Sequence, residues 1–195
     1  MNTSASAFAA SAPSSAWFDS ATRYGRISRW LHWGMASLFA WQFIGMGLRL
    51  ALGRTPVVSL FVGSHASVGL LLMLLVLLRG AWGLANRGRR PSHGAGWLGR
   101  AALAGHAGLY LLMAVVPLLA LVRAYGSGRA FMWFDTVPVF AAGPKNETLM
   151  APASLLHGPL AWVLLALVAG HVGMVLLHRW LWRDDVAQRM IGRVR

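Results

Sequence analysis

The chain has 195 residues, of which 57% are hydrophobic and 12% are charged, whereas about 25% of residues are charged in a typical soluble domain. This composition leaves too little polar surface for a water-soluble globule, so we expect one domain that uses the lipid bilayer as its solvent. The absence of Cys excludes disulfides, iron–sulfur clusters, thiolate zinc sites and thioether-linked c-type haem. The net charge of +13 lies in short blocks between long apolar runs, which indicates contact with lipid headgroups and not with nucleic acid.

Residues 1–22 are rich in Ser and Ala and contain no Lys or Arg. A signal peptide needs a basic start and a continuous apolar core, and this segment has neither. We therefore predict a disordered cytoplasmic tail over residues 1–22 and a membrane domain over residues 23–195.

Four apolar segments follow the tail, at residues 30–50, 60–84, 101–122 and 155–180. Each has about 20 residues or more, enough for a helix to cross a hydrocarbon core about 30 Å thick. A lone strand could not satisfy its backbone hydrogen bonds in lipid. The predicted fold class is therefore all-α, a four-helix transmembrane bundle. The longest connection, over residues 124–154, is expected to be functional or to cover a site.

The distribution of basic residues predicts the orientation. Of the 18 Lys and Arg residues, 13 lie in the N-terminal flank, the second connection and the C-terminal flank. The positive-inside rule then places both termini in the cytoplasm of a bacterial inner membrane, with the first and third connections outside.

Histidines inside these spans are costly in lipid and indicate function. In the predicted topology, His32 and His171 lie toward the cytoplasmic side, whereas His65 and His157 lie toward the outer side. His157 and His171 are 14 residues apart, which gives about 21 Å of rise and leaves the two side chains within about 40° of one helix face. Four imidazoles at two matched depths predict two non-covalent b-type haems with bis-His ligation, enclosed by the bundle.

Other interpretations of the histidines stay open. A histidine in a membrane helix can simply form an interhelical hydrogen bond, and a metal-transport path would be expected to include acidic residues, which the four segments lack. His106 has no obvious partner, so we expect helix packing, contact with a ligating residue or contact with a haem propionate there instead of ligation. His93 and His178 are expected to be solvated, and the nine Met to fill the core.

These residues lie in motifs that resemble the bacterial cytochrome b561 family, four-helix di-haem membrane proteins. "RYGRISRWLHW" (23–33) resembles the family's entry to its first helix, with His32 as ligand, and "GSHASVGLLLMLLVLLRGAWG" (63–83) resembles its second helix, with His65 as ligand. "GHAGLYLLMAVVPLLAL" (105–121) is similar to the third helix, including its break at Pro117. "LLHGPLAWVLLALVAGHVGMVLLHRWLWRDDVAQRMI" (155–191) is similar to the fourth, with ligands at His157 and His171.

The resemblance implies electron transfer to or from quinone. In the superoxide oxidase branch, superoxide donates an electron at the outer haem and ubiquinone is reduced, so we expect that activity or oxidation of another small outer donor. The alternative is a cytochrome subunit that relays electrons between quinone and a partner dehydrogenase or hydrogenase. The outward Arg49, Arg54, Arg123, Arg129 and Lys145 would attract a small anion.

Overall fold

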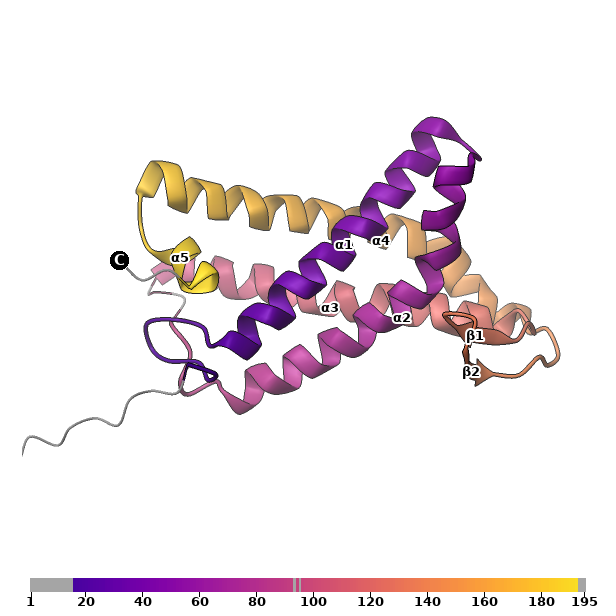
Figure 1. Ribbon diagram of the computed structural model, residues 1–195, viewed down its shortest axis with the longest axis horizontal. Helices are drawn as coiled ribbons and strands as arrows, with labels where there is room; N and C mark the ends of the chain where they lie inside the picture. The colour runs from indigo at the N-terminus through magenta and orange to yellow at the C-terminus, as the bar shows by residue number, and fades with distance from the viewer. Residues whose placement is uncertain (1–15, 93, 95, 193–195) are drawn as a thin grey trace, which may run out of the picture.

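The computed structural model describes residues 16–92, 94 and 96–192. Four long helices dominate it: α1 (Arg26–Leu52), α2 (Pro56–Ala85), α3 (Gly96–Gly126) and α4 (Glu147–Leu177), the last continued by the π-helical turn η1 (His178–Trp182). All four are long and apolar enough to cross a membrane, which confirms the predicted four-helix transmembrane architecture. Figure 1 shows α3 and α4 running side by side, with α1 crossing them obliquely.

The helices pack as two antiparallel pairs. α1 packs against α2, α3 packs against α4, and contacts between α2 and α3 join the pairs, while α1 and α4 make little backbone contact with each other. Two ends can be distinguished (Figure 1). The terminal end holds the start of α1 and the end of α4, and the hairpin end holds a short β-hairpin between α3 and α4.

Local sequence explains where two of the helices begin. Thr55 precedes α2, and its Oγ1 accepts a hydrogen bond from the Val58 backbone N–H at 3.3 Å, with Pro56 at the first helical position. Asn146 caps α4 in the same way, since its Oδ1 accepts from the Leu149 N–H at 3.2 Å. Side-chain oxygens before a helix satisfy N–H groups that have no partner within it.

A buried apolar layer fills the middle of the bundle. It contains residues from all four helices: Met35, Val68, Leu72, Val76, Met113 and Leu164. Leu164 stands halfway along the sequence between His157 and His171. The layer therefore separates the hairpin-end histidines from the terminal-end histidines.

The predicted loop over residues 124–154 is mostly regular structure. α3 continues to Gly126, α4 begins at Glu147, and between them β1 (Phe131–Trp133) pairs antiparallel with β2 (Val137–Phe140). The hairpin lies against α2, because the Trp133 Nε1–H donates to the Ser67 carbonyl at 3.0 Å and the Phe134 N–H donates to the Ser67 Oγ at 2.9 Å. The third connection thus packs on α2 at the hairpin end.

The expected break at Pro117 is wrong, because α3 continues through that residue. A proline removes one helical hydrogen bond, and packing against a neighbouring helix lets a membrane helix retain its course there. α4 similarly contains Pro152 and Pro159.

Part of the predicted tail, residues 1–15, lies outside the described residues, whereas residues 16–25 fold against the terminal end. The Asp19 carboxylate is fully buried, accepts from Arg90 Nε at 2.9 Å, and accepts from the Gly25 N–H at 2.8 Å. The Phe18 ring stacks on Trp82 with centroids 5.7 Å apart. The short helix α5 (Val186–Ile191) closes the same end, where Trp33 Nε1 donates to the Met190 carbonyl at 3.4 Å.

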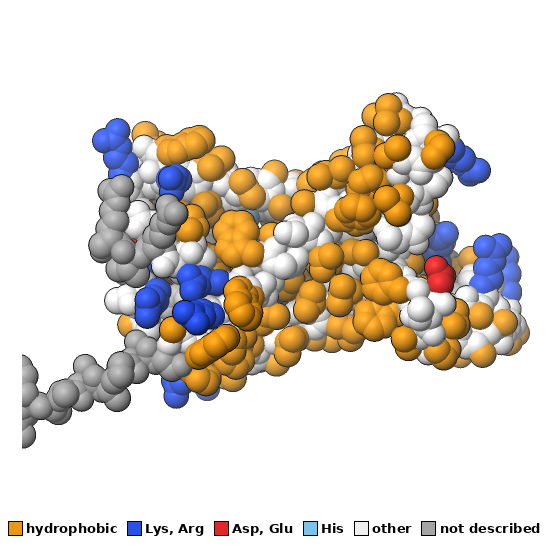
Figure 2. Space-filling view, in the orientation of Figure 1, with side chains coloured by type: hydrophobic (Ala, Val, Ile, Leu, Met, Phe, Trp, Pro, Cys, Tyr) orange, Lys and Arg blue, Asp and Glu red, His pale blue; other side chains and the backbone are white. Residues whose placement is uncertain are grey.

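Side-chain chemistry divides the surface into zones. Figure 2 shows hydrophobic side chains over the middle of the molecule and Lys and Arg gathered at its two ends. Many large apolar side chains in the middle zone are exposed, including Ile44, Leu77 and Leu111. This arrangement suits a protein whose sides face lipid and whose ends face headgroups and water.

Candidate functional site: two facing histidine pairs

The terminal-end pair joins the first and last long helices. His32 of α1 and His171 of α4 have ring centroids 6.2 Å apart and ring planes at 74°. Both side chains are half-buried. The two residues are 139 positions apart in the chain, so only the bundle brings them together.

The hairpin-end pair repeats this geometry. His65 of α2 and His157 of α4 have centroids 6.2 Å apart and ring planes at 77°, and both side chains are half-buried. The structure therefore brings together the same two pairs that the helix depths predict.

The separation of the rings suits a metal ion between them. A metal ion lies about 2 Å from a ligating imidazole nitrogen, which lies about 1.1 Å from its ring centre, so two imidazoles on opposite sides of one ion have centres about 6.2 Å apart. Among the described residues, no group of three or more His, Cys, Asp or Glu could hold a metal ion. Two imidazoles alone suit a metal whose remaining ligands come from a macrocycle, as in haem.

Hydrogen bonding orients one of these rings. His157 Nδ1 lies 3.0 Å from the Val116 carbonyl oxygen of α3. A carbonyl can only accept, so Nδ1 carries the proton and Nε2 is left with its lone pair. Metal-binding histidines generally use their second nitrogen in this way.

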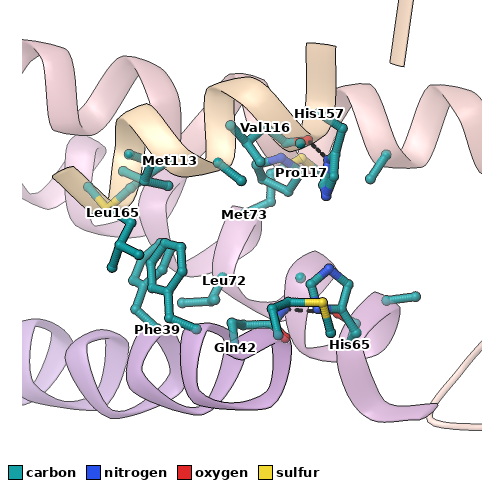
Figure 3. Close-up of a pocket in the computed structure, with 18 of the residues that line it drawn as sticks. Phe39, Gln42, His65, Leu72, Met73, Met113, Val116, Pro117, His157 and Leu165 are labelled. Carbon is teal, nitrogen blue, oxygen red and sulfur yellow. Dashed lines mark hydrogen bonds between the residues drawn. The ribbon is translucent and has the colours of Figure 1, made fainter. Parts of the chain in front are cut away.

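A cavity of about 330 Å³ lies beside the hairpin-end pair, lined by residues of all four long helices and by Phe131 of the hairpin. Figure 3 shows His65 and His157 on opposite sides of it, with Phe39, Leu72 and Leu165 at its apolar end. Gly47 and Gly158 also line it, and a Cβ added at either glycine would meet no atom within 4 Å. Side chains at these two positions would point into open space, so the glycines leave room for a flat group. The donor set, the apolar walls and this space fit a haem.

His106 is nearer to the site than the sequence predicts. Its ring centroid lies 5.4 Å from that of His171, and its Nδ1 lies 2.7 Å from the Ala102 carbonyl of its own helix. The prediction that it lacks an obvious partner is wrong, since its position near the start of α3 puts it at the depth of His171. The 5.4 Å between the His106 and His171 ring centroids is shorter than the 6.2 Å between the ring centroids in each of the two pairs.

Sequence reasoning missed one polar residue at the hairpin-end cavity and one at the terminal end. Gln42 of α1 lines the cavity, and the Arg79 guanidinium lies 5.7 Å from the centre of the Tyr110 ring. An amide or guanidinium inside an otherwise apolar span was the available signal.

The remaining histidines lie away from the pairs. His178 is not fully solvated as expected, because its Nδ1 is 2.6 Å from Asp184 Oδ2. Asp184 follows η1 in the chain. Partial desolvation raises the pKa of the Asp184 carboxyl, but the hydrogen bond with His178 outweighs this effect and lowers that pKa below its usual range. His93 lies outside the described residues.

Comparison with known proteins shows the family to which the chain belongs. The family model described as prokaryotic cytochrome b561 matches residues 23–193. "Cytochrome b561 homolog 2" of Escherichia coli (strain K12) is 30% identical over 182 residues, covering 88% of this chain and 92% of that protein. "Cytochrome b561 homolog 1" of the same organism is 27% identical over 180 residues, covering 88% and 98% respectively. With its four membrane helices and facing imidazoles, the chain belongs to the prokaryotic cytochrome b561 family, and it is a multi-pass bacterial membrane cytochrome that binds b-type haem and transfers electrons.

Proposed function

We propose that the chain holds two b-type haems, one between His32 and His171 and one between His65 and His157. The equal separation of 6.2 Å in both pairs supports this assignment. A haem held by a pair of these imidazoles would supply one-electron transfer. The two pairs are about 21 Å apart along α4, with the apolar layer around Leu164 between them.

We further propose that the physiological reaction is oxidation of superoxide, or of another small anionic donor, coupled to reduction of ubiquinone in the membrane. Two superoxide ions give up one electron each and leave as oxygen, and one ubiquinone takes up both electrons and two protons to become ubiquinol. The proposal depends most on Arg49, which lines the hairpin-end cavity together with His65 and His157. A guanidinium at the cavity attracts an anion toward the histidine pair.

The hairpin end is the outer face in this proposal. Arg49, Arg54, Arg123, Arg129 and Lys145 lie there, against Asp135 and Glu147. Lys145 pairs with Glu147 at 2.5 Å, so the four arginines provide most of the unpaired positive charge. The larger number of basic residues at the terminal end favours a cytoplasmic position for both termini.

Stopped-flow reduction of the purified holoprotein by superoxide tests this function. We expect rapid appearance of the reduced b-type band in the wild type, slower at high salt because screening weakens electrostatic steering. Arg49→Gln should slow reduction by about tenfold, in the range of steering effects. Arg54→Gln is the matched control, since Arg54 belongs to the same end but not to the cavity lining, and it should have a smaller effect. Haems that superoxide does not reduce would sink the proposal.

The alternative function is a cytochrome subunit that relays electrons between quinone and a partner dehydrogenase or hydrogenase. It is favoured by one observation: within residues 16–92, 94 and 96–192, nothing outside the bundle is larger than a short hairpin, a terminal segment and the six-residue α5. Co-purification of a redox enzyme with the full chain, together with haems inert to superoxide, would select this alternative.

A further inference from the structure

A buried amide contacts one histidine of the hairpin-end pair. Gln42 of α1 is only 9% exposed, and its Nε2 donates to the backbone carbonyl of His65 at 2.9 Å. A Cβ placed on Gly69 would lie in ordinary van der Waals contact with the same Nε2, at 3.5 Å, so the amide lies against this face of α2. Gln42 and His65 both line the cavity (Figure 3).

Two further polar atoms of these residues are buried without a hydrogen-bond partner. They are the Gln42 side-chain carbonyl Oε1 and the His65 ring nitrogen Nδ1. Oε1 can only accept a hydrogen bond, and Nδ1 becomes a donor when Nε2 serves as a ligand. Buried polar atoms are nearly always hydrogen-bonded, so a complementary acceptor and donor on two residues already in contact require an explanation.

The Nδ1 of His157, across the cavity from His65, already has a hydrogen-bond partner, whereas the Nδ1 of His65 has none. His157 Nδ1 lies 3.0 Å from the Val116 carbonyl, and histidines that bind a metal generally donate their second ring N–H to such an acceptor. The backbone carbonyl of His65 is already the acceptor for Gln42 Nε2. The Gln42 Oε1 is therefore an acceptor of suitable chemistry for the His65 ring.

We propose that Gln42 is a positioning residue for His65: in the holoprotein its carbonyl Oε1 accepts the Nδ1–H of His65, which holds Nε2 toward the metal. This inference rests on the haem assignment proposed above. The amide then contacts His65 twice, through the backbone carbonyl and through the ring. Accepting a hydrogen bond from Nδ1–H would make the imidazole a more strongly donating ligand and stabilise the oxidised iron, so Gln42 would lower the reduction potential of this haem alone.

Redox titration of the holoprotein, with electron paramagnetic resonance of both low-spin haems, tests the proposal. In Gln42→Met, which retains size and loses both hydrogen-bonding atoms, one haem should become easier to reduce. We expect its oxidised-to-reduced equilibrium to change about tenfold, a rise of about 59 mV for one electron. The resonance of that haem should also shift, since its axial ring is free to rotate. The other haem should keep its potential and its spectrum.

Two further variants separate positioning from helix packing. Trp41→Phe removes another hydrogen bond between α1 and α2, that of Trp41 Nε1 to Ser64 Oγ at 3.0 Å, and should leave both potentials unchanged. Gln42→Glu retains an acceptor for His65 and should not raise either potential. If Gln42→Met leaves both potentials and spectra as in the wild type, or if Trp41→Phe produces the same shift, Gln42 is only an interhelical contact and the proposal is overturned.

The haem content of His65→Ala shows whether a failure belongs to the inference about Gln42 or to the assignment of a haem to His65 and His157. If His65→Ala loses one haem while Gln42→Met changes no potential, the inference about Gln42 fails and the assignment stands. If His65→Ala retains both haems at full occupancy, the assignment itself fails, and the inference fails with it.

Discussion

At the scale of single residues, the three imidazoles of the terminal end are not equivalent. The His32 and His171 ring centres are 6.2 Å apart, a separation that suits a metal ion between them, whereas His106 and His171 are 5.4 Å apart. His106 Nδ1 is also 2.7 Å from the Ala102 carbonyl. His106 therefore suits a contact beside the haem better than ligation.

We predict that His106→Ala retains two haems per chain, because neither pair loses a ligand. His32→Ala should lose one haem. Haem per protein, measured as the pyridine haemochrome, distinguishes the two variants. Loss of a haem in His106→Ala with retention in His32→Ala would assign ligation to His106 instead.

Sequence predicts the depths of the histidines well and their contacts poorly. The rise of a helix is fixed, so His157 and His171 could be placed at two depths, each opposite one partner. The approach of His106 to His171, and of Gln42 to His65, depends on the rotation and tilt of neighbouring helices. These are set by packing over the whole bundle, which one sequence does not specify.

At the scale of elements, the β-hairpin is the feature that sequence patterns did not predict. Its turn has left-handed backbone at Phe134 (φ 48°) and Asp135 (φ 58°), positions where Gly, Asn or Asp is the usual signal, so Phe134 is the unexpected residue. Such residues cost about 1–3 kcal/mol each and require compensation from the surrounding structure. The hydrogen bond from the Phe134 N–H to the Ser67 Oγ provides part of that compensation.

We predict that Ser67→Ala destabilises the protein by about 1–3 kcal/mol, because the Phe134 N–H loses its acceptor in a half-buried site. Ser59→Ala is the matched control. The Ser59 Oγ donates only to the Thr55 carbonyl at an exposed position of the same helix, so its loss should change little. Thermal unfolding in detergent measures both. Equal midpoints for the two variants would show that the hairpin contact does not stabilise the fold.

At the scale of the whole molecule, the two ends differ in how they are closed. The terminal end is covered by residues 16–25 and by α5, and it includes the ion pair between the buried Asp19 and Arg90. The hairpin end exposes arginines beside the cavity that contains His65 and His157. Composition alone predicted the four spans, because about 20 apolar residues per segment allow no other fold in lipid.

We predict that both termini are cytoplasmic, since basic residues are retained on that side during insertion. Fusion of alkaline phosphatase, which is active only outside the cytoplasm, to the C-terminus should give an inactive reporter. A fluorescent protein that folds in the cytoplasm, fused at the same position, should be bright. The reverse pattern would place the hairpin end inside and remove the basis for an outer anionic donor.

Haem stoichiometry in His157→Ala tests most directly whether two histidine pairs hold two b-type haems. The wild type should contain two haems per chain, and His157→Ala should contain one, because only the pair with His65 is broken. The double variant His157→Ala, His171→Ala should contain none. Two haems per chain in His157→Ala, or a wild type without a reduced-minus-oxidised b-type band, would contradict the account.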